Sequence, residues 1–288
     1  MRFAICPTPR PWWENKKQLH DWVQLAEDLG FDAIFLPDHC MLPIVTNELV
    51  DAWVTLSYIS AITERIRLGT NVSPLPRYTP SYLAKMISTV DYLSNGRTIV
   101  GLGAGAVPEE FINYSLGFDS PSVRVDKFRE GVEIMLKLWT EDKVTYDGKY
   151  YRLKDAVLYP KPLQKPHPPI WSGCLGDRML KITAKYFNGW IFPRSVPRAY
   201  LPIQEFEKRA RAIREYAKKY GRDMRNFTFA VLGSINDDAK IIEEYMHAGC
   251  NYYIVELFKG PGLSNPYSSG EYLEVTRKFA KEIMPSFI

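Results

Sequence analysis

The sequence has few cysteines and no long stretch of charge of one sign. Its four cysteines, Cys6, Cys40, Cys174 and Cys250, show no CxxC or metal-type spacing in 288 residues. A disulfide scaffold is therefore excluded, and free thiols in a cytoplasmic protein are expected. The net charge is only +4, from 37 basic and 33 acidic residues, with no clustered basic run. We therefore expect no nucleic-acid partner, because a phosphate footprint needs clustered Lys and Arg.

Long apolar runs are missing as well. No uncharged apolar segment approaches the ~18–20 residues that a membrane-spanning helix needs, so no membrane partner is expected. The first apolar run, residues 1–6, is too short for the apolar region of a signal peptide. The chain has four histidines, no H-x-H pair, and only one histidine, His39, directly after an expected strand. This scarcity disfavours a metal site, so we predict none.

Short apolar runs of strand length alternate along the chain with segments of helical periodicity. The expected strands cover residues 1–6, 31–36, 66–72, 98–102, 169–172, 190–192, 227–233 and 251–257. The expected helices cover residues 19–29, 51–62, 80–94, 125–139, 176–186, 202–220, 237–247 and 271–284. Parallel strands need crossover helices, and eight such units can close on themselves. The pattern therefore predicts an α/β protein with a TIM (β/α)₈ barrel, and a doubly wound open sheet is the alternative.

One segment interrupts this alternation. Residues 140–168 separate the fourth expected helix from the fifth strand. Within them, residues 144–152 predict a β-hairpin that turns at Asp147-Gly148, and the prolines that follow favour an extended arm. No shift in composition marks a domain boundary. We therefore expect one domain over residues 1–288, with an insertion at about 140–168.

Candidate site residues are those that directly follow a strand, because barrel enzymes carry their sites at the carboxyl ends of the strands. Asp38 and His39 follow the second expected strand. An imidazole titrates near neutral pH and can donate a proton or stabilise charge, and Asp38 beside it could fix its tautomer or its charge. The alternative is that Asp38 only caps the next segment. We predict that His39 and Asp38 are catalytic residues.

Two glycine-containing turns follow the fourth and fifth strands. Residues 101–106 (GLGAGA) match G-x-G-x-x-A, and their bare backbone lets a flat ligand approach closely. Residues 173–176 (GCLG) lead into a helix, whose N-terminus can bind a phosphate. A tight turn with Asp177 as the N-cap is the alternative for this second segment.

Together these features resemble the bacterial luciferase-like flavin oxidoreductase family, in particular its branch that uses the deazaflavin coenzyme F420. The resemblance spans roughly residues 2–260. The segments that carry it are Asp38-His39, residues 69–72 (GTNV), 95–97 (NGR), 101–105 (GLGAG), 109–111 (EEF), 166–171 (PHPPIW) and 188–190 (NGW). The resemblance implies a barrel that is often a homodimer, a cis peptide at Asn71-Val72 behind the coenzyme ring, and a phosphate on the 173–176 loop.

The resemblance also implies a set of cofactor-binding residues and an activity. The residues are Asp38, His39, Asn71, Val72, Gly103, Ala104, Gly105, Ala106, Glu109, Gly173, Cys174, Leu175 and Gly176. The implied activity is hydride transfer between coenzyme F420 and a small-molecule substrate, with His39 as proton donor or charge stabiliser and Asp38 as its orienter. Family members that oxidise a sugar phosphate have a glutamate where this chain has Ala106, so that substrate is not carried over.

Three other functions stay open on the sequence. The first is an FMN-dependent monooxygenase of the same family, since the two cofactors differ by one ring atom. The second is a flavin-binding protein without catalysis, and the third is a barrel that binds no flavin, such as an isomerase.

Overall fold

The structure is a computed structural model that describes residues 1–7, 15–42, 49–196, 199–258 and 267–287. Its strands are β1 (Arg2–Cys6), β2 (Ala33–Leu36), β3 (Arg67–Thr70), β4 (Ser73–Pro74), β5 (Thr98–Gly103), β6 (Val144–Asp147), β7 (Arg152–Ala156), β8 (Ile170–Ser172), β9 (Gly189–Pro193), β10 (Ser195–Val196), β11 (Ala199–Tyr200), β12 (Thr228–Ser234) and β13 (Tyr252–Glu256). Its α-helices are α1 (Lys16–Asp28), α2 (Ala52–Ile62), α3 (Pro80–Leu93), α4 (Glu109–Ile112), α5 (Pro121–Thr140), α6 (Asp177–Tyr186), α7 (Ile203–Lys219), α8 (Ala239–His247) and α9 (Ser269–Glu282). Two 3₁₀ turns, η1 (Leu75–Arg77) and η2 (Met284–Phe287), complete the set.

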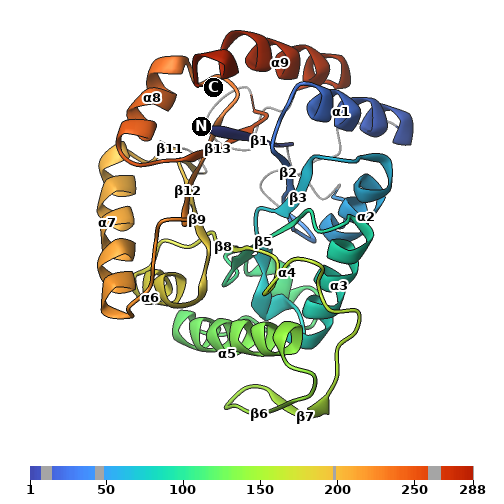
Figure 1. Cartoon of the computed structure of the whole chain (residues 1–288), viewed down its shortest axis with the longest axis vertical. Helices are drawn as coiled ribbons and strands as arrows, with labels where there is room; N and C mark the ends of the chain where they lie inside the picture. Colours follow the sequence, from blue (N-terminus) through green and yellow to red (C-terminus); the bar gives the residue numbers. More distant parts are fainter. Residues whose placement is uncertain (8–14, 43–48, 197–198, 259–266, 288) are drawn as a thin grey trace.

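The parallel strands close into a barrel. Their order is β3-β2-β1-β13-β12-β9-β8-β5-β4, and β3 also pairs with β5. Since β3 and β4 are the two parts of the third expected strand, the barrel has eight strand positions. The predicted (β/α)₈ fold is therefore confirmed, and the open sheet is excluded because β3–β5 pairing joins its two ends. Figure 1 shows helices α1–α3 and α5–α9 as a ring around these strands.

The helices follow local signals in the sequence. In α1 the residues Leu19, Trp22, Val23 and Ala26 recur at helical spacing, and all four are buried against the barrel. Asn15 caps this helix, since its side chain accepts hydrogen bonds from the first turn of backbone N–H groups. Amphipathic helices of this kind turn one face to the sheet, so they fix the ring of helices around the strands.

The middle of the barrel is filled by aromatic rings. The ring of Trp171 contacts Phe35 and Tyr252, with centroid separations of 5.5 and 4.9 Å. Phe35 occupies the space that a side chain at Gly69 would need, since a Cβ there would lie 2.5 Å from Phe35 Cε1. The barrel is thus a packed core rather than a pore, and a ligand must bind at an open end.

The insertion carries the predicted hairpin. Strands β6 and β7 pair antiparallel, with Asp147 opposite Arg152, so the expectation of a turn after Asp147 is confirmed. Figure 1 shows this hairpin beyond α5, outside the ring of helices. Two small features were not predicted: the β10–β11 pair and the short helix α4. Helix α4 matters for the site because it buries Glu110 while Glu109 stays exposed.

Candidate active site

A cavity of about 490 Å³ opens at the carboxyl ends of the barrel strands, and all eight strand positions contribute to its lining. Its volume lies in the range of cofactor and substrate pockets. Both glycine-containing turns face it. The sequence-predicted residues that line it are His39, Asn71, Val72, Gly103, Ala104, Gly105, Ala106, Gly173, Cys174, Leu175 and Gly176. Asp38 and Glu109 do not line it, so the structure does not bring these two to the predicted site.

Val72 stands between the two glycine turns. The Asn71-Val72 peptide is cis, as the resemblance implied. A Cβ at Gly103 would lie 2.8 Å from Val72 Cγ2, and one at Gly173 would lie 2.7 Å from Val72 Cγ1. Glycine at both positions therefore makes room for the Val72 side chain and leaves the two backbones bare beside it. This is a cradle that a Cβ would fill, and a planar ring lying on Val72 fits it.

The loop of residues 173–176 is held from outside by two side chains. Trp190 Nε1 donates to the Cys174 carbonyl oxygen over 2.8 Å, and Arg209 Nε donates to the Leu175 carbonyl oxygen over 3.2 Å. Gly176 is the N-cap of α6 and supplies no side-chain cap. The first N–H groups of this helix therefore have no side-chain acceptor, which is the arrangement that binds a phosphate or another anion.

Asp177 does not cap α6, contrary to the alternative considered for this turn. It is the first helical residue, and its carboxylate contacts Lys181 Nζ at 2.8 Å and Tyr216 Oη at 2.5 Å. These partners hold the carboxylate along the outside of the helix. The N-cap position is left to glycine, which has no side chain to compete with a ligand.

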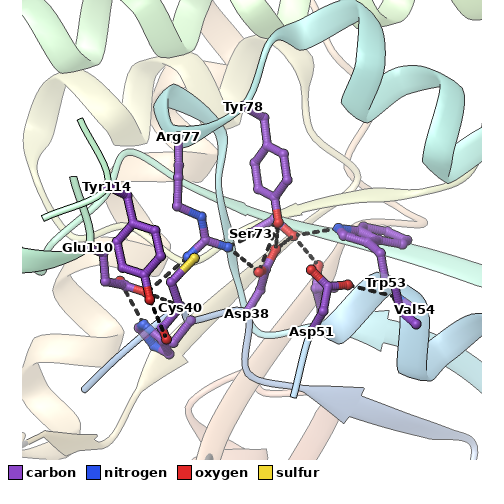
Figure 2. Close-up of polar contacts among 12 residues, drawn as sticks. Asp38, Cys40, Asp51, Trp53, Val54, Ser73, Arg77, Tyr78, Glu110 and Tyr114 are labelled. Atoms are coloured by element: carbon purple, nitrogen blue, oxygen red, sulfur yellow. Dashed lines mark hydrogen bonds and ion pairs between the residues drawn. The ribbon is translucent and has the colours of Figure 1, made fainter. Parts of the chain in front are cut away.

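A group of charged and polar side chains reaches the cavity through His39 and Glu110, and Figure 2 shows its contacts around Arg77. We call it the ion-pair cluster, formed by Asp38, His39, Ser73, Arg77, Tyr78 and Glu110. Arg77 is its centre, since Nη1 donates to Glu110 Oε1 over 2.9 Å and Nη2 donates to Asp38 Oδ1. The Arg77 side chain is 6% exposed, and the two carboxylates are 2% exposed each. One guanidinium therefore compensates two buried carboxylates.

Glu110 is the hydrogen-bond partner of His39. His39 Nδ1 lies 2.9 Å from Glu110 Oε2, and the Cys40 N–H donates to Glu110 Oε1 over 2.6 Å. Burial raises the pKa of Glu110, but these two contacts and the Arg77 charge outweigh burial and lower it overall. Glu110 is thus a carboxylate that accepts a hydrogen bond from His39 Nδ1–H, so His39 Nε2 is the ring nitrogen available to a ligand.

The expectation that Asp38 orients His39 is wrong. Asp38 Oδ2 accepts hydrogen bonds from Ser73 Oγ (2.5 Å) and Tyr78 Oη (2.9 Å), beneath the cavity. Burial raises the pKa of Asp38, and the Arg77 guanidinium opposes that rise. Successive side chains of an extended segment point to opposite sides, so Asp38 turns away from the cavity that His39 faces. Asp38 acts through Arg77, which it holds in place.

Sequence reasoning missed Glu110, Arg77 and Glu256. Periodicity could not choose between Glu109 and Glu110, because α4 has only four residues. Arg77 lies in the 3₁₀ turn η1, and no local pattern in the sequence distinguishes it from a surface arginine. Glu256 ends β13 and lines the cavity, so the strand-end rule that selected His39 would have selected it too. Burial raises the pKa of Glu256 to about 8.

The fold and the cavity together define a class: a (β/α)₈ barrel whose open end presents two glycine turns and a helix N-terminus to one cavity. Residues 2–281 match the luciferase-like monooxygenase family, and the chain belongs to it.

Comparisons with individual proteins agree with this family. The chain is 34% identical over 179 residues to an F420-dependent glucose-6-phosphate dehydrogenase from Microbacterium testaceum, covering 60% of this chain but only 52% of that protein. Monooxygenase RslO1 from Streptomyces bottropensis superposes with a TM-score of 0.84 at 20% identity, over the full length of both chains. An F420-dependent secondary alcohol dehydrogenase, solved with an F420-acetone adduct, superposes with a TM-score of 0.81 at 19% identity, again over both full chains. At these identities the two structures establish the shared fold.

Within the described ranges, no group of three or more potential metal ligands comes together. The helices of the same ranges include none that is long and apolar enough to cross a bilayer.

Proposed function

We propose that this protein is an oxidoreductase that transfers hydride between coenzyme F420 and a small organic substrate. One observation carries the proposal: both glycine turns, Val72 and the N-terminus of α6 face a single cavity. The match to relatives named as F420-dependent dehydrogenases supports the choice of coenzyme. The chain spans about half the length of those relatives, so their sugar-phosphate substrate is not part of the proposal.

Each part of the cavity would have a role toward the coenzyme. Val72 and the 103–106 turn would hold the ring, and the 173–176 loop with the first N–H groups of α6 would hold the phosphate. When bound, the coenzyme supplies the hydride donor or acceptor. His39 Nε2 would give a proton to, or take one from, the substrate oxygen or nitrogen. Glu110 would keep the proton of His39 on Nδ1 and stabilise positive charge on the His39 imidazole.

An FMN-dependent monooxygenase is the second candidate. The family name and the similarity to monooxygenase RslO1 favour it. A fluorescence or calorimetric titration of the purified protein with each cofactor decides between the two. We expect F420 to bind at least about tenfold more tightly than FMN. Binding of FMN with no measurable binding of F420 would reject the first candidate.

Substitution of His39 tests the catalytic part of the proposal. Loss of a positioned general acid or base lowers turnover by roughly 10²–10⁴-fold. We therefore expect His39→Ala to lower oxidation of reduced F420 by at least about 100-fold when the coenzyme is saturating. His20→Ala, on the outer surface of α1, is the control. Full turnover of His39→Ala would remove the proposed role, and tight binding without turnover by the wild type would favour a non-catalytic flavin-binding protein.

We propose that the protein is a homodimer and that it works in the cytoplasm. Large apolar side chains are exposed on α2 and α3, namely Val54 (71%), Tyr82 (74%), Tyr92 (54%) and Leu93 (59%), and such groups mark interfaces. Light scattering of Tyr82→Ser/Leu93→Ser is expected to show monomers where the wild type forms dimers.

The four cysteines are all free thiols, which supports a reducing compartment. Cell fractionation tests the second proposal.

A further inference from the structure

Glu256 faces the cavity from the side opposite the glycine turns. It is the last residue of β13, and β13 stands four positions from β5 around the closed barrel. Its strand neighbours in register are Cys6 on β1 and Ser234 on β12. The rest of this side of the lining is apolar and includes Ile191 and Leu232. We call Glu256 and the lining residues Cys6, Ile191 and Leu232 the Glu256 wall.

The Glu256 carboxyl has no partner in the described part of the chain. No hydrogen bond or ion pair joins it to a described residue, and burial is what shifts its pKa. The Cys6 thiol donates toward the Pro7 carbonyl instead, and both burial and Glu256 raise the pKa of that thiol. Glu256 is half-buried and its carboxyl lines the cavity, so a ligand that fills the cavity removes this carboxyl from water and must supply a hydrogen-bonding partner in exchange.

The other charged groups near the cavity already have partners. His39 and Glu110, from the ion-pair cluster, bind each other. Asp237, which follows β12, accepts hydrogen bonds from Arg194 Nη1 (2.7 Å) and from Tyr253 Oη (2.6 Å). None of these groups compensates a negative charge on Glu256. Burial raises the pKa of Glu256 to about 8, and a carboxyl that keeps its proton offers one O–H donor beside one carbonyl acceptor.

We propose that the Glu256 carboxyl, which lines the cavity and has no partner among the described residues, binds the carbonyl and amide edge of the planar cofactor ring. That edge presents a C=O acceptor next to an N–H donor, which is the complement of a protonated carboxyl. The ring would then rest on Val72 and the glycine turns at one side and meet Glu256 at the other. This inference rests on the proposed function for the occupant of the cavity, but deazaflavin and flavin share this edge, so it does not depend on which of them binds.

The test is the pH dependence of coenzyme affinity in wild-type protein, Glu256→Gln and Glu256→Leu, followed by quenching of ring fluorescence with F420 as the probe. If only the neutral acid binds the ring, wild-type affinity falls about tenfold one pH unit above the pKa of Glu256. Glutamine keeps a donor and an acceptor and cannot ionise. Glu256→Gln should therefore match the wild type at pH 6.5 within about threefold and show no such fall, while Glu256→Leu binds roughly tenfold more weakly throughout.

The glutamine profile is the reference for any effect of pH on the coenzyme itself. Glu243→Gln, on the exposed side of α8, is the matched control and should follow the wild type. Circular dichroism and melting curves show whether each variant is folded. Parallel profiles of wild type and Glu256→Gln, or wild-type affinity in folded Glu256→Leu, would overturn the proposal.

Failure of the proposed function gives a different result. If F420 does not bind the wild type but FMN does, the choice of coenzyme is wrong, and the same series with FMN decides the role of Glu256. If neither cofactor binds the wild type, both proposals are overturned.

Discussion

The two sides of the cavity carry the same residue type with pKa values shifted in opposite directions. In the ion-pair cluster, Glu110 receives contacts from His39, Arg77 and the Cys40 N–H, and its pKa is lowered. On the Glu256 wall, burial is what shifts the pKa of the Glu256 carboxyl, and it raises that pKa to about 8. Both glutamates line one cavity. The comparison teaches that the partners, and not the depth of burial alone, decide whether a cavity carboxyl is an anion or an acid.

This contrast divides the chemistry of the site. A fixed anion beside His39 suits a histidine that carries and transfers a proton. A neutral acid opposite it suits recognition of an uncharged polar edge, because no charge is desolvated when the ligand binds. Paired groups whose surroundings push their pKa values apart are typical of sites that need an acid and a base at one pH.

The largest expected effect comes from removing the shared cation of the ion-pair cluster. Arg77→Leu leaves the buried carboxylates of Asp38 and Glu110 without their guanidinium, which should lower the free energy of unfolding by about 3–5 kcal/mol. Urea unfolding at pH 7 measures it. The control is Arg152→Leu, which breaks an exposed pair with Asp147 and should cost less than about 1 kcal/mol. Equal small losses in both variants would mean that the cluster is no more than a surface pair.

The two glutamates should respond to pH with opposite sign. The folded-state pKa of Glu256 is raised from the ordinary glutamate pKa of 4.5 to about 8. The contribution of Glu256 to stability is therefore fully present below pH 4.5 and is lost as the pH rises through about 8. At pH 8 the free energy of unfolding of Glu256→Gln should therefore exceed that of the wild type by on the order of 2–4 kcal/mol. This difference should vanish near pH 4.5.

Glu110→Gln supplies the opposite arm of this comparison. The folded-state pKa of Glu110 is lowered from the ordinary glutamate value of 4.5. Its contribution to stability is therefore present above pH 4.5 and is lost as the pH falls through the lowered pKa. Glu110→Gln should be less stable than the wild type at pH 7 by about 1–3 kcal/mol, with a difference that shrinks in acid. Thermal melting from pH 4 to pH 9 measures both variants, and shifts of the same sign would contradict the contrast.

The smallest expected effect separates two adjacent glutamates. Glu109 is exposed and lies outside the cavity, whereas Glu110 is buried at its edge. Glu109→Gln should change coenzyme affinity by less than about twofold. It should change the free energy of unfolding by less than about 0.5 kcal/mol. A loss of tenfold or more in a coenzyme titration would restore the sequence-based expectation that Glu109 binds the cofactor.

Much of the site could be predicted because one rule governs barrels of this kind. The glycine turns and His39 follow expected strands, so knowing the strands was enough to place them at one end. Val72 ends the third expected strand and entered the predicted site only through the family resemblance. Asp38 was misplaced because its partners, Ser73, Arg77 and Tyr78, lie 35 to 40 residues away in sequence. Nothing in the local pattern brings a guanidinium between two distant carboxylates.

By itself, the sequence determined the alternation of strand and helix, and with it the barrel and the end that carries the site. Periodicity and turn residues act over a few positions, so they can be read along the chain. Only the tertiary structure decided the charge of each acid. Protonation depends on which groups meet across the closed barrel, and closure brings Glu110 to His39 and Arg77 while it leaves Glu256 among apolar side chains.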